Sequence, residues 1–184
     1  MRQTLRRKLL WGGMVAVVLV AGVGLWLFQP WKLFTRSTVD EALPFVSTTT
    51  VASVVATAPT AVPTTTVSPT GPRVLAEGAF VSQEHPTSGT ARVLEQDGTR
   101  ILRLEGFSTS DGPDVHVWLS ATPAAADWKA YNSTRHVALG KLKATDGNHN
   151  YAIPVDADLA GLQSAVIWCD RFNVAFGSAP LSLT

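Results

Sequence analysis

The sequence predicts an all-β fold, a compact antiparallel β-sandwich or barrel-like domain, preceded by one N-terminal transmembrane helix and a disordered linker. Three observations support this. Residues 73–184 contain many short strand-like runs, separated by Gly, Pro, Asp and Asn at a spacing of about ten residues. An uncharged apolar stretch lies near the N-terminus. A segment rich in Thr, Pro, Ala and Val separates that stretch from the β-domain.

A hairpin is the clearest local prediction in the β-domain. Asp97-Gly98 stands between the strand-like runs 89–96 and 99–106, and Asp-Gly favours a two-residue turn between antiparallel strands. In that register Glu95 lies opposite Arg100, which is a favourable cross-strand pair.

Residue patterns predict further strands. Residues 114–120 alternate between aliphatic side chains on one face and His116 and Trp118 on the other. Residues 164–170 are apolar on both faces, which predicts a central strand covered on both sides. We expect residues 172–176 and 180–183 to close the fold, and residues 123–131 to form a short helix or turn in a connection.

The N-terminus is expected to anchor the chain in a membrane. Residues 9–28 carry no charge, and as a helix they would span about 30 Å, the thickness of a bilayer core. Four cations in residues 1–8 favour a basic tail in the cytoplasm. The stretch ends in bulky residues rather than in a small-residue cleavage site. An uncleaved signal-anchor helix over residues 9–31 is therefore preferred to a cleaved signal peptide.

Residues 37–72 are expected to form a disordered linker. From residue 46 to residue 72 the chain has no charge and consists of Thr, Val, Pro, Ala, Ser and one Gly. Thr and Val favour strands, but the spaced prolines keep such a chain extended and remove donors that a sheet needs. This linker would hold the β-domain, residues 73–184, away from the bilayer, with a reach of roughly 110 Å at full extension.

The charge pattern argues against a nucleic-acid-binding protein. The formal net charge is +1, yet all six charges in residues 1–36 are basic, whereas residues 73–184 carry twelve acids and nine bases. A nucleic-acid-binding face needs clustered Lys and Arg, which the β-domain lacks. The single Cys also excludes an intramolecular disulfide, a Cys-only zinc site and a C-x-x-C motif.

That single residue, Cys169, is the main candidate for chemistry. Free Cys is among the most buried residue types, so Cys169 fits the role of a small core residue. A lone thiol is also unusual outside the cytoplasm, where it can oxidise, and this favours a redox thiol or a thiolate ligand. If the strand continues past Cys169, Arg171 lies on the same face and would lower the pKa of the thiol. Both interpretations stay open.

Other residues could support a site at Cys169. Asp114 and His116 project to one face of a strand, so the carboxylate could orient the imidazole, although a semi-exposed strand histidine is the simpler interpretation. His85 precedes a proline in a loop, where a histidine is available to a ligand or simply solvated. Trp168 and Phe172, together with Phe176, could wall an apolar pocket or be plain core. His149 lies in the turn-like run 146–150 and is expected to be structural or incidental.

No motif supports a conventional enzyme, and whether a metal is bound stays unknown from the sequence. A blue-copper site would need two His, one Cys and usually an axial Met, but both methionines lie outside the β-domain. A zincin helix, a phosphate loop, a G-x-S-x-G elbow and an EF-hand are all missing from the sequence. Asp111-Gly112-Pro113-Asp114 matches half a calcium loop and is better explained as a turn.

Several stretches of the β-domain together resemble a known family. They are residues 78–82 with His85 and 87–91, residues 112–120, residues 139–143 and 150–154, and residues 166–169 with Phe172 and 176–181. On these motifs the chain is similar to the DM-thirteen domain family, also called the electron transfer DM domain, over nearly all of residues 74–183. That family occurs in exported bacterial proteins and in animal surface and matrix proteins, often beside haem-binding DOMON domains. The resemblance implies a β-sandwich-like domain in which Cys169 is the signature cysteine, a redox thiol or a ligand to a prosthetic group such as haem.

Two functions are compatible with these features. The first is a single-pass protein of the bacterial cell membrane, whose extracytoplasmic domain has a redox, electron-transfer or cofactor-binding role centred on Cys169. Its partner is then expected to be a separate exported redox or surface protein. The second is a non-catalytic cell-surface module that binds a ligand or a protein, with Cys169 in the core. A reactive thiol or a bound cofactor favours the first, and an inaccessible thiol favours the second.

Overall fold

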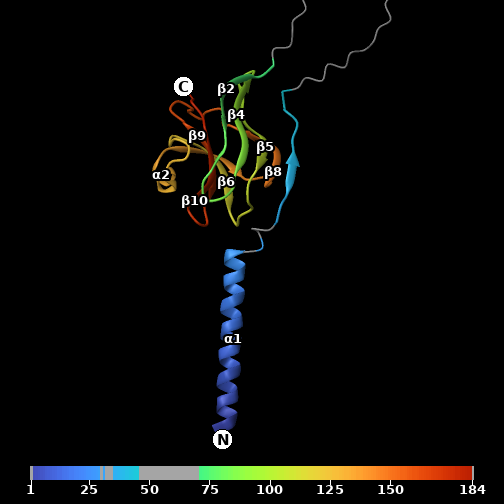
Figure 1. Cartoon of the computed structure of the whole chain (residues 1–184), viewed down its shortest axis with the longest axis vertical. Helices are drawn as coiled ribbons and strands as arrows, with labels where there is room; N and C mark the ends of the chain where they lie inside the picture. The colour runs from blue at the N-terminus through green and yellow to red at the C-terminus, as the bar shows by residue number, and fades with distance from the viewer. Residues whose placement is uncertain (1, 30, 32–34, 46–70, 184) are drawn as a thin grey trace, which may run out of the picture.

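The β-domain is a sandwich of two sheets (Figure 1). The computed structural model describes residues 2–29, 31, 35–45 and 71–183. In these residues one sheet has the strand order β1-β8-β5-β4-β2 and the other the order β3-β10-β9-β6-β7, and we call them the β5 sheet and the β9 sheet. Their strands are β1 (Thr38–Asp40), β2 (Arg73–Ala79), β3 (Val81–Ser82), β4 (Ser88–Gln96), β5 (Thr99–Ser108), β6 (Val115–Ser120), β7 (His136–Lys141), β8 (Asp146–Ala152), β9 (Ser164–Cys169) and β10 (Val174–Pro180). The predicted all-β fold is confirmed.

The β4–β5 hairpin forms in the predicted register. Glu95 pairs with Arg100 across the two strands. The turn residues Asp97 and Gly98 have φ angles of 52° and 76°, and positive values at both positions are what the favoured two-residue hairpin turn requires. The inner faces of β4 and β5 contribute Val93, Leu102 and Leu104 to the main core between the sheets.

Strand β9 is buried on both faces, as its sequence predicts. It lies in the centre of its sheet, between β6 and β10, and all six of its residues are buried. Its inner face packs into the main core, whereas its outer face packs into a second cluster with Trp118 and Tyr131. Tyr131 belongs to the helix α2 (Trp128–Ser133), which begins after the N-cap Asp127. The closing strand runs from Val174 to Pro180, so the expected strands at 172–176 and 180–183 are only partly correct.

The N-terminal helix α1 (Arg2–Phe28) precedes the β-domain. Most of its described apolar side chains are exposed, among them Trp11, Val17, Leu19, Val20 and Trp26. Among the described residues, no helix combines the length and apolarity that crossing a membrane requires. The described residues therefore give no support to the membrane span expected at residues 9–31.

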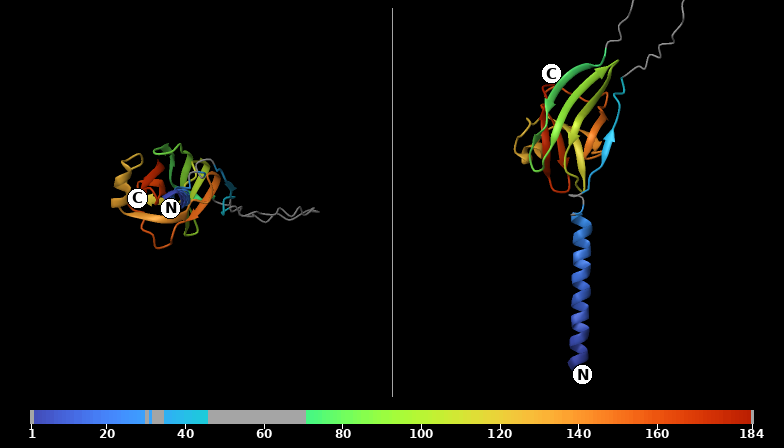
Figure 2. Two further views of the ribbon diagram at one scale, coloured as in Figure 1. Left: turned by 90° about the horizontal axis from the view of Figure 1, so that it is seen from below. Right: turned by 45° about the vertical axis from the view of Figure 1, so that its right-hand side comes forward.

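Residues 35–42 bind along the edge of the β5 sheet, and we call them the strap. Strand β1 within the strap pairs in parallel with β8, with Val39 opposite Gly147 (Figures 1 and 2). Arg36 forms an ion pair with Asp146, and Thr35 donates a hydrogen bond of 2.8 Å to Asp111. The prediction therefore placed the start of the linker, residue 37, too early, because residues 38–40 form a strand of the domain.

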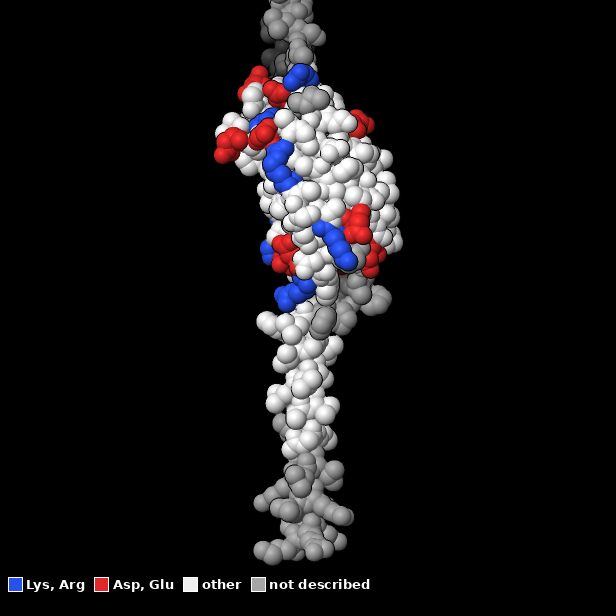
Figure 3. All heavy atoms as spheres, turned by 90° about the vertical axis from the view of Figure 1, so that its left-hand side faces the viewer, with Lys and Arg blue, Asp and Glu red and all other residues white. Residues whose placement is uncertain are grey.

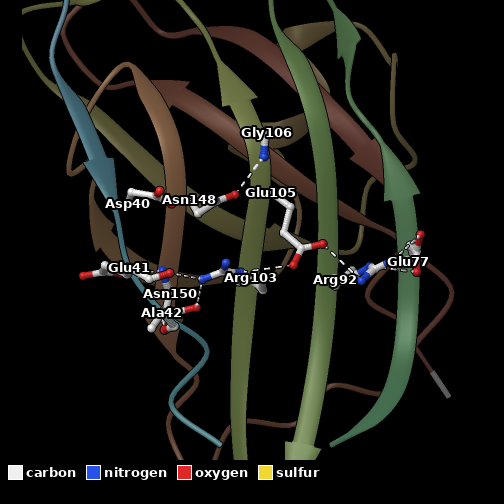
Figure 4. A network of polar contacts seen from close by, with 10 residues as sticks. All are labelled: Asp40, Glu41, Ala42, Glu77, Arg92, Arg103, Glu105, Gly106, Asn148 and Asn150. Carbon is white, nitrogen blue, oxygen red and sulfur yellow. Dashed lines mark hydrogen bonds and ion pairs between the residues drawn. The ribbon is translucent and has the colours of Figure 1, made fainter. Parts of the chain in front are cut away.

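A polar network on the outer face of the β5 sheet holds the end of the strap (Figure 4). The Lys143 ammonium lies 2.8 Å from the Glu41 carboxylate. Arg103 donates to the Glu41 carbonyl and, at 3.0 Å, to Asn150. Arg103 is only 6% exposed, so its charge depends on these acceptors and on Glu105 at 3.3 Å. The pairing with Lys143 lowers the pKa of Glu41, and the pairing with Arg36 lowers the pKa of Asp146.

The strap changes the expected role of the linker. Residues 46–70, the larger part of that linker, lie outside the described residues, but β1 and β2 on either side of them are the two edge strands of one sheet. The segment therefore connects two parts of the domain and cannot act as a stalk that holds it away from α1. Only the seven residues from 29 to 35 join α1 to the first strap contact, a reach of at most about 25 Å.

His149 lies in β8 rather than in the predicted turn. Its ring is fully buried and packs edge-on against Phe107 at 5.5 Å. Nε2 lies 3.0 Å from the Asp146 carbonyl oxygen, so Nε2 carries the proton and Nδ1 is the acceptor. Nδ1 is buried without a hydrogen-bond partner in the described part of the chain. Burial lowers the pKa of His149, because a proton on Nδ1 would place a charge in the core.

We expect the strap to remain bound after the chain is cut within residues 46–70. With a protease site inserted there, the N-terminal fragment should co-purify with the β-domain fragment, because the strap contacts do not depend on the connection. Gly147→Ala should release it, since a Cβ at residue 147 would lie 2.0 Å from the Val39 carbonyl oxygen. Gly140→Ala is the matched control, because Gly140 has a similar φ of 120° against 109° but no atom within 4 Å of the added Cβ. Immediate separation of the wild-type fragments on a sizing column would contradict the strap.

His149 should make the stability of the protein depend on pH. Its pKa is lowered in the folded state, so its contribution is present above the unfolded value of about 6.5 and is lost as the pH falls toward the lowered pKa. His149→Phe and His149→Gln should both flatten the fall in melting temperature between about pH 7 and pH 5. Burial also lowers the pKa of His85, so His85 keeps its contribution to the pH dependence in both variants. An unchanged slope in both would show that His149 does not titrate on unfolding.

Candidate functional site around Cys169

Cys169 is the last residue of β9, and its side chain lies in the main core. It pairs with Val115 of β6 on one side and Val174 of β10 on the other. Its exposed fraction is 0%. Alternation along β9 places the neighbouring Trp168 on the opposite face, in the second cluster. The sequence suggested that Trp168 could form a pocket wall beside Cys169, but the two side chains lie on opposite faces of the strand.

The Cys169 sulfur faces three backbone N–H groups. These groups belong to Phe172 and Arg171, which follow β9, and to Asp114, which precedes β6. Burial raises the pKa of the thiol, and the three N–H groups oppose that shift because they stabilise a thiolate. Burial dominates, so the resting group is a neutral thiol. The expected role of Arg171 was wrong, because β9 ends at Cys169 and the exposed Arg171 contributes its backbone rather than its guanidinium.

A turn of four residues, 170–173, covers the sulfur. Asp170 donates its backbone N–H to the Asp114 carbonyl oxygen at 3.0 Å, which ties the turn to the start of β6. Asn173 has a φ of 54°, in the left-handed region that Asn tolerates better than most residues. The Phe172 side chain is 42% exposed, so it lies on the cover of the site and not in an inner wall.

Three ligand-type side chains meet just outside this cover. His116 Nε2 lies 3.1 Å from an Asp114 oxygen and 3.4 Å from an Asp170 oxygen. The contact between Asp114 and His116 is the one that strand alternation predicted, whereas no sequence pattern pointed to Asp170. All three groups have ligand atoms within 4.8 Å of one another, a set that suits a divalent cation. Lys141 competes for the same Asp114 oxygen at 3.0 Å, and its hydrogen bond is the main cause of the lowered pKa of Asp114.

His85 occupies the loop predicted for it, at another edge of the core. Its ring packs on Phe176 with 4.0 Å between centroids, and burial lowers its pKa. Phe176 is 1% exposed and belongs to the same core cluster as Cys169. His85 is thus linked to the cysteine through packing.

The architecture and the cysteine site agree with one family of domains. The family model described as Electron transfer DM13 matches residues 79–181, which is more than half of the chain. The chain belongs to the DM13 family. The match spans all of β3 to β10, and it includes Cys169 with its covering turn. Comparison with curated proteins and with solved structures gave no match.

The haem that the resemblance implies does not fit the DM13 cysteine in this conformation. A haem thiolate needs an apolar pocket with room for the macrocycle beside the sulfur. One hollow of about 270 Å³ lies near Asp114 and Lys141, and a second of about 480 Å³ lies near Arg73 and Arg100. Neither is lined by Cys169, which is packed on all sides. The Asp114, His116 and Asp170 group is the set of side chains here that could hold a metal ion.

We expect the covering turn to control access to the thiol. Asn173→Ala should speed labelling of Cys169 by a small alkylating reagent roughly five- to tenfold, because a left-handed Ala costs about 1 kcal/mol and favours opening of the turn. Asn173→Gly is the matched control: it loses the same side chain but accepts a positive φ, so labelling should stay near the wild-type rate. The chain has one Cys, so the mass of the intact protein reports this residue alone. Equal rates in all three proteins would rule out gating by the turn.

Proposed function

We propose that this protein is a membrane-tethered electron-transfer protein whose extracytoplasmic DM13 domain uses Cys169 as its redox group. The observation that carries the proposal is a fully buried cysteine at the end of β9 whose raised pKa is opposed by hydrogen bonding from three backbone N–H groups. A cysteine that only fills space needs no such donors, whereas N–H groups directed at a sulfur tune the potentials of redox and ligand thiolates. The family description supports the same role.

The turn over Cys169 would link its two states. Closed, the sulfur is buried and its pKa is raised, so the thiol resists oxidation. Opening of residues 170–173 removes the burial that dominates the shift. The thiol then loses its proton to water, the thiolate gives one electron to an oxidising partner, and the N–H groups of the turn are close by to stabilise the sulfur. The partner is a separate exported redox protein.

The membrane tether is the second part of the proposal. A helix that exposes large apolar side chains along its length needs an apolar environment, and α1 exposes Trp11, Leu19 and Trp26 by more than 60% each. Four cations before the apolar stretch favour a cytoplasmic N-terminus and an extracytoplasmic domain. The short connection to the strap would then keep the domain close to the bilayer surface.

A second candidate function rests on the burial of the same residue. Cys169 is fully buried in the main core cluster, and burial raises the pKa of its thiol. Both facts suit a cysteine that serves packing alone. The domain would then be a non-catalytic surface module that binds a ligand or a protein, and its redox chemistry would be nil.

Protein-film voltammetry of the full chain in detergent distinguishes the two functions. We expect a reversible wave for the wild type that is missing in Cys169→Ser, a variant of similar size whose oxygen still accepts the three N–H groups. Ser164→Ala is the control, because it alters a buried residue at the other end of β9 and should keep the wave. A wave that survives in Cys169→Ser, or no wave in the wild type, would overturn the redox role of Cys169 and favour the binding module.

A further inference from the structure

Three stacked rings run from the interior of the β9 sheet to its surface. The Trp168 and Trp118 rings stack with centroids 4.9 Å apart and 24° between their planes. Trp118 in turn stacks on His136 of β7 at 4.1 Å and 12°. The first ring is 0% exposed, the second is 6% exposed and the third is exposed. We propose that this stack is a one-electron relay that connects the interior beside Cys169 with the solvent face at His136. The inference deepens the proposed electron-transfer function and rests on it.

The register of the strands builds the stack. Trp118 pairs with Val166 in β9 and with Ala138 in β7, so Trp168 and His136 are its diagonal neighbours, two residues away on either side. Diagonal neighbours on one face are within reach of aromatic side chains. All three rings lie on the outer face of the sheet. Trp168 is joined to Cys169 by one peptide bond, although the two side chains point to opposite faces.

The environment of Trp168 suits electron transfer without proton loss. Its indole Nε1–H is buried and has no hydrogen-bond acceptor in the described part of the chain. Leaving a buried donor unpaired is destabilising, so such a group calls for an explanation, and a redox role is one of those known. An oxidised Trp168 would have no nearby base to take its proton. Its radical cation would keep that proton and could be reduced again without any atom moving.

Tyr131 borders the relay but is poorly suited to carry it. Its ring lies 6.3 Å from Trp168 and is tilted by 60°. Its hydroxyl donates to the Pro123 carbonyl oxygen at 3.0 Å and contacts the Ser178 hydroxyl at 3.2 Å, and neither is a base. Burial raises the pKa of Tyr131. Oxidation of a tyrosine requires loss of its proton, so an electron hole on Trp168 passes to Trp118 rather than becoming trapped at Tyr131.

The exposed end of the stack suits a redox protein as partner. Figure 3 looks onto the side of the domain where α2 lies in Figure 1, and it shows charged side chains in an upper and a lower group with an uncharged surface between them. The chemical class of the partner is a strong one-electron acceptor, a metalloprotein with a high-valent iron centre, because an indole gives up an electron only to a strong oxidant.

The electrons balance in two steps. The oxidised metal centre at the His136 end takes one electron from the Trp118 indole and is reduced by one charge, which leaves a Trp118 radical cation. Trp168 then gives one electron to Trp118, which restores it, and the hole moves to the interior. No bond forms or breaks, and no proton is transferred in either step.

Photo-oxidation tests the relay in the full chain in detergent. The starting protein carries Phe at positions 11, 26, 31 and 128, so that Trp118 and Trp168 are its only tryptophans. A tris(bipyridine)ruthenium(III) ion generated by a laser flash serves as the diffusing one-electron oxidant, and transient absorption follows the indole radical. Trp118→Phe should slow radical formation about tenfold or more, because no readily oxidised ring then lies between the buried Trp168 and the surface. Tyr131→Phe is the matched control and should keep the rate within about twofold.

Each outcome of this test decides between relay and packing. An unchanged rate in Trp118→Phe overturns the relay, because the oxidant then reaches Trp168 by another route. An equal loss of rate in Tyr131→Phe also overturns it, because the effect would follow from disturbed packing. Thermal melts of both variants check that they are folded, and Trp168→Phe, which retains the outer ring, should keep the initial rate.

The thiol of Cys169 separates failure of the relay from failure of the proposed function. If the hole passes on, Cys169 gives one electron to Trp168 and its thiol proton to water through the opened turn, and the thiyl radicals of two chains couple to an intermolecular disulfide. After repeated oxidation without oxygen, loss of the free thiol in the two-tryptophan protein but not in its Trp118→Phe variant supports both. A normal relay rate with an intact thiol overturns the role of Cys169 and leaves the relay standing. Rapid thiol loss that does not depend on Trp118 overturns the relay as the route to Cys169.

Discussion

The double coverage of strand β9 is the constraint on which the site depends. A strand in the centre of a sheet, covered on both faces, must place successive side chains in two separate clusters. Trp168 and Cys169 are therefore adjacent in the chain but belong to different packing environments. The inner cluster surrounds the thiol, and the outer cluster stacks the tryptophans. Neither arrangement would arise in a strand that has one of its two faces open to water.

The strap determines where this site can be presented. Its contacts join residues that are more than 100 positions apart, such as Glu41 with Lys143 and Arg36 with Asp146. Individually, ion pairs between exposed groups contribute little. Here they act together with a parallel strand pairing and with the nearly buried Arg103, which requires acceptors from the strap. Thr35, the first residue of the strap, contacts Asp111 in the turn that leads to Asp114. The N-terminal end of the strap therefore lies near the segment that faces the Cys169 sulfur. The cysteine end of the sandwich is thus the end closest along the chain to α1.

The parts of the fold that sequence reasoning predicted are those specified by local signals. The Asp97-Gly98 turn fixes a register between neighbours, and the apolar run 164–169 specifies a strand covered on both sides. The strap was missed because three residues carry no detectable period and its partner strand is distant. His149 was assigned to a turn because Gly and Asn surround it, but tertiary pairing with β5 overrides that preference. At the site, strand alternation predicted the contact between Asp114 and His116, but β9 ends at Cys169, two residues before Arg171, so the alternation that would align Arg171 with Cys169 does not continue.

Packing, rather than residue type, decides whether Cys169 could be a haem ligand or is a free thiol. A cysteine beside aromatic residues is compatible in sequence with a haem pocket, but a pocket needs space on the sulfur side, and here that space is filled by the core and by the turn 170–173. The same turn supplies N–H groups that a simple core residue would not require. Burial and hydrogen bonding therefore act in opposite directions on one sulfur, and the closed state is the one in which burial wins. The turn that covers the sulfur is short and contains Asn173 in the left-handed region. Opening it exposes only a few residues while both sheets stay intact, so its free-energy cost is small compared with that of global unfolding. A redox role for Cys169 thus demands local motion of this turn, whereas the aromatic stack on the other face could work in a rigid domain.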